Sequence, residues 1–103
     1  MKKLSNSIVI EGRLEVIKEH PHYKNRMKLY LAQALNKGFI ERNDELRNVF
    51  TVIIDVEPSR DISELIINSY VRITGEFESM YELFLHGTND EFAIKVTKIE
   101  RID

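Results

Sequence analysis

The chain has 103 residues, of which 43% are hydrophobic and 31% charged, a composition that favours one soluble domain with a single core. It contains no cysteine, which excludes disulfide frameworks, thiolate metal sites and thiol nucleophiles. Fifteen Lys and Arg against 17 Asp and Glu give a formal net charge of −2. This balance argues against binding duplex DNA by overall attraction but does not exclude a local basic groove.

The first expected strand covers Ser7 to Ile17. Its apolar residues fall at even positions from Ile8 to Val16, and this period of two is typical of a strand with one buried face. Gly12 belongs to the same inward-facing series, where a missing side chain allows the sharp bend that a small barrel requires. Histidine and proline at residues 20–22 then end the strand.

Two further strands are expected before the middle of the chain. Met27, Leu29 and Leu31 alternate with other residues, which predicts a strand that ends at the turn cluster Asn36 to Gly38. A polar loop over residues 36–48 follows. The run Val49 to Val56 is apolar on both parities, which predicts a central strand that is partly covered on both faces.

The second half predicts one short helix and two strands. Asp61 and Glu64 form a capping box before apolar residues at helical spacing, Ile62, Leu65 and Ile66. Alternation predicts a strand over Tyr70 to Phe77 and a last strand that begins at Phe92, joined by a hairpin or long loop over residues 78–91. Gly75, Phe77 and Phe92 lie in inward registers, and we expect both phenylalanines in the core.

Three strands, one short helix and two strands predict an all-β fold, a five-stranded OB-fold barrel with the helix between strands three and four. We expect residues 1–103 to form this single domain. An SH3-like barrel would lack the inserted helix, and a ferredoxin-like domain would need a second helix.

The segment Asn-Ser-Ile-Val-Ile-Glu-Gly-Arg-Leu at residues 6–14 resembles the opening of the OB domain in the bacterial single-stranded DNA-binding protein family. The segments Leu31-Ala32, Phe50 to Ile54 and Val71 to Phe77 are similar to the family's second, third and fourth strands, although the acid Glu76 follows the glycine here. The resemblance covers nearly the whole chain. It implies an OB fold, binding to single-stranded DNA, and a homodimer or homotetramer assembled through the first strand.

Two features depart from the family's pattern. The base-stacking tryptophans are absent, and Phe50 stands where one would lie, which predicts weaker binding or a shorter footprint. The family's flexible tail with an acidic tip has no counterpart in residues 1–103, so we expect no recruitment of partner enzymes through such a tail.

A binder of single strands needs flat rings for the bases and cations for the phosphates, and stacking contributes about 1–3 kcal/mol per base. OB-folds bind ligands across strands two and three and with the flanking loops. The candidate single-stranded DNA-binding residues are therefore the rings and cations of these segments: Lys24, Arg26, Lys28, Tyr30, Lys37, Phe39, Arg42, Arg47, Phe50, Tyr81 and Phe84.

Several of these residues have a structural interpretation that stays open. Tyr30 would equally suit a dimer contact and Phe50 the core, while Tyr81 and Phe84 would suit a small loop cluster. The successive cations Lys24, Arg26 and Lys28 are also typical of a solvated edge that discourages strand pairing.

The rings and cations predict binding to single-stranded DNA with little sequence preference and no enzymatic activity, and the resemblance implies that this binding protects DNA in replication, recombination or repair. The sequence has no nucleophile elbow, Walker loop or Rossmann fingerprint. His20, His22 and His86 lack the rest of a tetrahedral set, so we expect no metal and no cofactor. Two alternatives remain, an OB-fold protein-interaction or primosome-type accessory module and an RNA-binding OB domain, because stacking does not distinguish ribose from deoxyribose.

The N-terminus lacks the continuous apolar segment of a secretory signal, and no window is apolar enough to span a bilayer. We therefore expect a cytoplasmic, nucleoid-associated protein whose partners include neither a membrane nor a small-molecule substrate.

Overall fold

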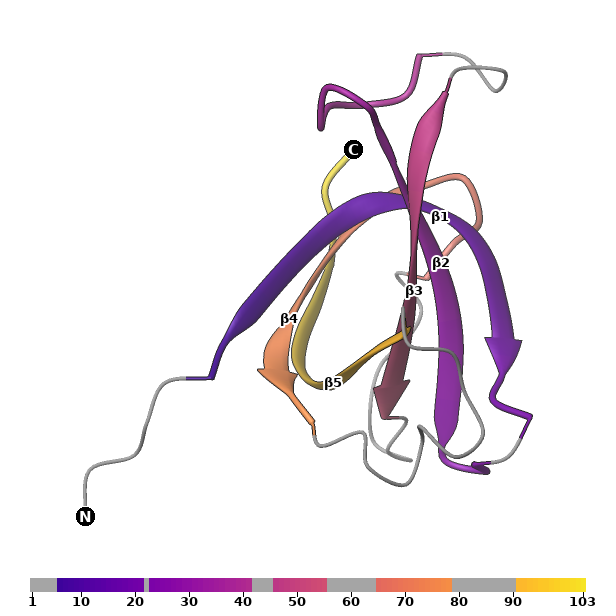
Figure 1. Ribbon diagram of the computed structural model, residues 1–103, viewed down its shortest axis with the longest axis vertical. Helices are drawn as coiled ribbons and strands as arrows, with labels where there is room; N and C mark the ends of the chain where they lie inside the picture. The colour runs from indigo at the N-terminus through magenta and orange to yellow at the C-terminus, as the bar shows by residue number, and fades with distance from the viewer. Residues whose placement is uncertain (1–5, 22, 42–45, 56–64, 79–90) are drawn as a thin grey trace.

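The computed structural model describes residues 6–21, 23–41, 46–55, 65–78 and 91–103. These segments contain five strands, β1 (Ile8–Glu19), β2 (Arg26–Ala34), β3 (Arg47–Asp55), β4 (Tyr70–Phe77) and β5 (Glu91–Arg101). The strands close into a barrel in the order β1-β2-β3-β5-β4 (Figure 1). The β3–β5 pair is parallel, whereas the other four pairs are antiparallel. The predicted five-stranded all-β barrel is therefore confirmed.

Only the end of the segment predicted as a helix lies within the described residues. Residues 56–64, which include its capping box, lie outside the described residues, and Leu65 and Ile66 are not helical. In the segments that the structure describes, no helix is long and apolar enough to cross a membrane.

A glycine allows the longest strand, β1, to bend and pair with both β4 and β2. Ile8 to Arg13 pair with β4 and Arg13 to Glu19 pair with β2, so β1 arches across one end of the barrel (Figure 1). Gly12 lies at this change of partner. A Cβ on Gly12 would lie 3.0 Å from the Ala32 carbonyl oxygen, so the missing side chain allows the close crossing that the bend requires.

A bulge in β1 reverses which side chains face the core. Leu14 pairs with Leu31, but Val16 pairs with Tyr30, so Glu15 is an extra residue between the two pairs. Beyond this point Ile17, not Val16, packs against the core. The expectation that Val16 continues the inward series was wrong, because one inserted residue moves every later side chain to the opposite face.

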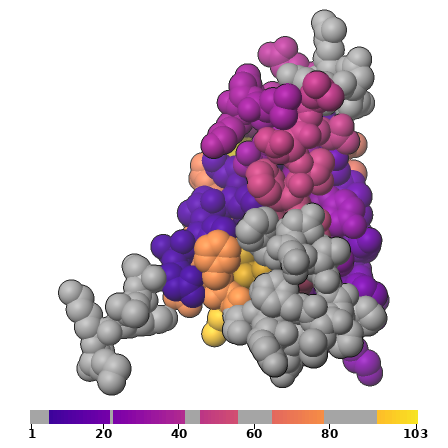
Figure 2. Space-filling model, in the orientation of Figure 1, coloured from indigo at the N-terminus to yellow at the C-terminus, as the bar shows by residue number. Residues whose placement is uncertain are grey.

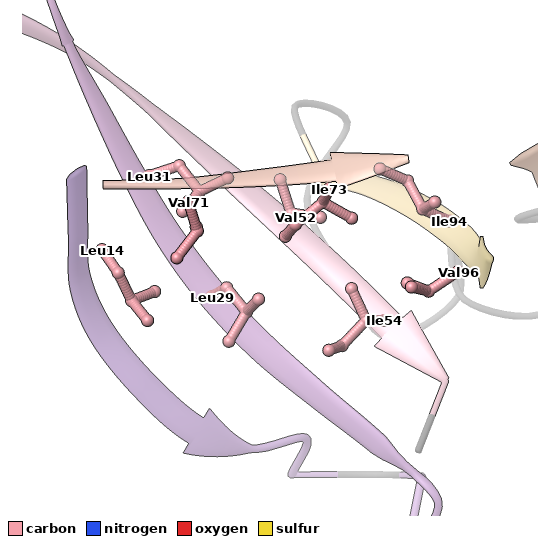
Figure 3. Close-up of a cluster of buried hydrophobic side chains, with 9 residues drawn as sticks. All are labelled: Leu14, Leu29, Leu31, Val52, Ile54, Val71, Ile73, Ile94 and Val96. Carbon is pink, nitrogen blue, oxygen red and sulfur yellow. The ribbon is translucent and has the colours of Figure 1, made fainter. Parts of the chain in front are cut away.

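The barrel interior is one apolar cluster to which every strand contributes (Figure 3). Full burial of each such side chain contributes about 1.5–3 kcal/mol. The alternation predicted for the second and fourth strands is confirmed at Leu29, Leu31, Val71, Ile73 and Gly75, which are buried, whereas Met27 is only partly buried. The cluster consists of Leu14, Leu29, Leu31, Val52, Ile54, Val71, Ile73, Ile94 and Val96.

Residues of β3 are also covered on the outside of the barrel. Ile53 points away from the interior cluster, yet it is fully buried with Ala93 of β5, and Tyr23 packs against both. The prediction that β3 is partly covered on both faces is confirmed.

Phe77 is not a core residue. Its side chain is 45% exposed, because it ends β4 where the barrel interior ends. The side-chain amide of Asn6 binds its backbone, donating to the Phe77 carbonyl at 2.9 Å and accepting from its N–H at 3.2 Å. The side chain of Phe92, which was also expected in the core, lies outside the described part of the molecule.

Candidate nucleic-acid interface

The outer surface of β1 and β2 brings two lysines and one ring together. Lys18 pairs with Lys28, and the neighbouring pair is Val16 with Tyr30. The β2 members point outward because the alternating residue Leu29 points into the core. The Nζ atom of Lys18 lies 5.1 Å from the centroid of the Tyr30 ring, which is within the range of a cation–π interaction. We call Lys18, Lys28 and Tyr30 the strand face.

Lys18 is absent from the site residues predicted from the sequence. Unbroken alternation from Ile8 would place this even-numbered residue inside the barrel, whereas the bulge at Glu15 turns it outward. The adjacent apolar residues Val16 and Ile17 interrupt the alternation, and this irregularity was the available signal.

Arg47 is bound by a carboxylate. Its Nε atom donates to the Oε2 atom of Glu15 at 2.8 Å, and its Nη2 atom donates to Oε1 at 3.0 Å. Arg13 donates to the same Glu15 at 2.7 Å, so the bulge residue joins two guanidinium groups. Burial alone would raise the pKa of the Glu15 carboxyl, but the hydrogen bonds from Arg47 and Arg13 outweigh it and lower that pKa below its ordinary value.

Arg26 is bound in the same way at the other end of β2. Its Nη1 and Nη2 atoms donate to the two carboxylate oxygens of Glu78, at 2.8 and 2.6 Å. These hydrogen bonds raise the pKa of the Arg26 guanidinium. A phosphate would therefore have to compete with a bidentate carboxylate for the donors of both predicted arginines.

Lys37 lies in a tightly held turn that follows β2. It has a left-handed backbone, with a φ of 62°, which is uncommon for a residue with a long side chain. Its N–H donates to the Ala34 carbonyl at 2.8 Å, and the next N–H, that of Gly38, donates to the Asn36 side chain at 3.1 Å. In Figure 2 these residues, in magenta, lie beside the pink surface of β3 at one end of the molecule.

Phe39 is held in position by its buried neighbour Ile40. The next residue, Ile40, packs against Ala32 and Ala34, and its backbone N–H and carbonyl both bind the Tyr70 hydroxyl. The Phe39 ring lies edge-on to the Tyr70 ring, with centroids 4.3 Å apart, yet remains 57% exposed. The turn therefore presents an exposed ring in a fixed position.

A cavity of about 100 Å³ opens beside this turn. It lies between the turn after β2, the bend of β1 and the first residue of β4. We call its side chains Gln33, Lys37, Phe39 and Tyr70 the loop corner. The complete lining is Glu11, Gly12, Gln33, Lys37, Gly38, Phe39, Tyr70 and Ile102.

Of the remaining predicted site residues, those that the structure describes do not join these two groups. Phe50 pairs with Leu31, is partly buried and packs against the core, so it lies on the inner side of β3. Lys24 is exposed in the loop between β1 and β2, beside Tyr23. Arg42, Tyr81 and Phe84 lie outside the described residues, and no cluster of three or more potential metal ligands occurs within them.

No protein-family model and no curated protein matches the sequence. The structure, however, is similar to solved single-stranded DNA-binding proteins. Two crystal structures of the mitochondrial single-stranded DNA-binding protein Rim1 from S. cerevisiae match with a TM-score of 0.55. One is 14% identical over 96% of both chains, and the other is 16% identical over 94% of this chain and 93% of that chain.

The N-terminal domain of PriB from Thermoanaerobacter tencongensis, whose structure is described as dimeric, matches with a TM-score of 0.51 and 14% identity. The match covers 95% of this chain and 97% of that domain. At these identities the likeness shows the fold, and it extends over nearly the full length of each chain. The structural neighbours of this chain thus include OB-fold proteins, and one of them, Rim1, is a mitochondrial single-stranded DNA-binding protein.

Proposed function

We propose that the protein binds single-stranded DNA without catalysing a reaction. The observation that carries this proposal is the strand face, where the Tyr30 ring lies beside Lys18 and Lys28 on the outer surface of β1 and β2. Strands two and three of an OB barrel are its usual ligand surface. Rim1, which has the same fold, is described as a mitochondrial single-stranded DNA-binding protein.

Stacking and charge neutralisation would act together in this mechanism. A base stacks on the exposed side of a ring whatever its identity, so sequence preference on the strand face is slight. Lys18, Lys28 and Lys37 release counterions as they approach phosphates. If all three make such contacts, log K falls with log salt with a slope of about −2, since each contact on a single strand contributes about −0.7.

We also propose self-association through β1. Ile8 to Gly12 pair with β4 along one edge, and in the described residues no strand pairs with the other edge before Arg13. The side-chain amide of Gln33 donates to the Glu11 carbonyl at 2.7 Å, so Gln33 occupies this edge of β1 at Glu11. The residues of β1 that precede Glu11 are the part of the edge where a further strand can pair. Val9, in the open part, is 58% exposed. A second copy would pair there, as open edges invite.

A gel shift with single- and double-stranded DNA of one sequence, run beside a sizing column, tests both proposals. We expect the single strand to shift at a lower protein concentration than the duplex, and the free protein to elute as a dimer or tetramer. Equal affinity for both forms, or no shift at low salt with folded protein, would contradict the DNA proposal. Elution as a monomer would contradict self-association alone.

Competition between oligo(dT) and oligo(U) separates DNA from RNA binding. We expect oligo(dT) to compete more strongly, and stronger competition by oligo(U) would favour an RNA ligand. Protection of exposed single strands in replication, recombination or repair is the process that such binding would serve, in the cytoplasm.

A further inference from the structure

We infer that the cavity at the loop corner holds one unstacked base of the bound strand and favours a pyrimidine. This inference rests on the proposed function and adds a site that discriminates between bases. A nonspecific strand face and a discriminating cavity would then act on different nucleotides of the same strand.

The size of the cavity sets the first limit on its occupant. Pockets for drug-sized ligands have volumes of about 300–1,000 Å³, whereas an engineered protein cavity of about 150 Å³ holds benzene. The cavity here, about 100 Å³ and open to solvent, is smaller than both, so it would take one six-membered ring only in part, with the remainder of the ring and the sugar outside. A bicyclic purine would fit less well.

The rings at the cavity supply a stacking surface that is already in position. Phe39 is exposed on one side and braced on the other by Tyr70, whose hydroxyl is bound to the backbone of Ile40. An entering base would lose little affinity to rearrangement of these side chains, because their positions are set by contacts within the free protein.

The polar groups at the cavity suit the edge of a pyrimidine. The Gln33 amide nitrogen donates to the Glu11 carbonyl at 2.7 Å, which fixes the orientation of the amide because only the nitrogen can donate. Within the described residues the Gln33 side chain makes no other hydrogen bond, so its oxygen can accept one from the amino group of cytosine or the ring N–H of thymine.

Charge at the cavity also favours a nucleotide. Glu11 belongs to the lining, and its carboxylate is paired with Arg72 at 2.8 Å, which offsets its negative charge. Lys37 has no ion pair within the described residues, and the turn holds it in a left-handed conformation beside the cavity. Such a backbone position is often associated with function, and here it belongs to a lysine of the cavity lining, whose ammonium group would bind the phosphate of the inserted nucleotide.

Affinities for oligo(dT), oligo(dC) and oligo(dA) of one length, at one salt concentration, test the inference. The substitution Gln33→Met keeps the side-chain length and removes the hydrogen-bonding oxygen. We expect it to weaken binding of both pyrimidine oligomers about two- to tenfold, the range of one hydrogen bond, and to leave oligo(dA) affinity unchanged. Because adenines also stack on one another, the measure is the change in the pyrimidine-to-purine ratio from wild type to variant.

Two further variants make the result unambiguous. Phe39→Leu removes a largely exposed ring and keeps an apolar side chain beside Tyr70, and it should lower the same ratio even if Gln33→Met unfolds the turn. Tyr30→Ala is the matched control, since loss of a ring on the strand face should weaken all three oligomers equally. Wild-type ratios in both cavity variants would overturn the inference and leave the proposed function intact, whereas wild-type protein that binds none of the oligomers would overturn the function itself.

Discussion

The lysines of the strand face and the arginines that begin β2 and β3, Arg26 and Arg47, differ in how they are bound within the protein. Lys18 lies over the Tyr30 ring, in a pair of side chains that both face outward. Arg26 and Arg47 are instead held by Glu78 and Glu15 through two or more hydrogen bonds each. A cation that is close to a ring in the sequence is therefore available to a phosphate only if no carboxylate from a distant segment binds it in the folded protein.

The largest effect on binding is expected from the ring of the strand face. Tyr30→Ala should lower the affinity for oligo(dT) by about 5- to 150-fold, because stacking on one ring contributes about 1–3 kcal/mol. Tyr30 is partly buried on the outer surface of β2 and is not part of the core cluster, so the variant should stay folded, which urea unfolding checks. Fluorescence anisotropy of a labelled oligomer measures the affinity.

Tyr30→Phe is the control for this substitution, because it keeps the stacking surface and removes only the hydroxyl. It should bind within about twofold of wild type. Equal losses in both variants would show that the hydroxyl, and not the ring face, makes the contact.

A smaller effect, of opposite sign, is expected when the carboxylate that binds Arg47 loses its charge. Glu15→Gln should strengthen binding to oligo(dT) several-fold, because Arg47 no longer has to exchange a carboxylate for a phosphate. The slope of log K against log salt should become steeper by about 0.7 for one added phosphate contact. Unchanged affinity and slope would show that Arg47 lies away from the DNA path.

The smallest effect on binding is expected at Arg26. Arg26→Gln should leave DNA affinity near the wild-type value and lower the free energy of unfolding by about 0.5–1 kcal/mol, as for other partly exposed ion pairs. A double-mutant cycle with Glu78→Gln, measured by urea unfolding, isolates the pair. A large loss of DNA affinity with stability unchanged would mean that Arg26 contacts phosphate directly.

The same comparison predicts a difference in acid sensitivity. Because its pKa is lowered in the folded protein, the Glu15 carboxylate adds stability that is present above about pH 4.5, its ordinary pKa. This contribution is lost as the pH falls through the lower folded-state value. Wild type should therefore lose stability over that acid interval faster than Glu15→Gln, in unfolding curves collected at successive pH values. Parallel loss in both proteins would contradict the assignment.

The barrel was predictable from the sequence because its strands alternate so regularly. The predicted inward series of β2 and β4 matched the buried residues except at Met27 and Phe77, near the strand ends, and Gly12 marked the bend. The bulge at Glu15 was not predicted, because it depends on the register between β1 and β2. For this reason Lys18 was missing from the predicted site residues.

The candidate site was harder to predict because its contacts join distant segments. Glu15 and Arg47 are 32 residues apart, and Arg26 and Glu78 are 52 apart. Nothing in the local pattern shows such pairs. The brace between Tyr70 and Ile40, which positions Phe39, likewise spans 30 residues. Local composition identified the rings and cations, whereas their exposure and pairing depend on the closed barrel.

The most direct test is ultraviolet crosslinking of the protein to oligo(dT), followed by mass spectrometry of the peptides that carry nucleotide. Stacked aromatic rings should give the strongest crosslinks, so we expect them at Tyr30 and Phe39. Crosslinks confined to the outer surfaces of β4 and β5, with none at either ring, would contradict the account.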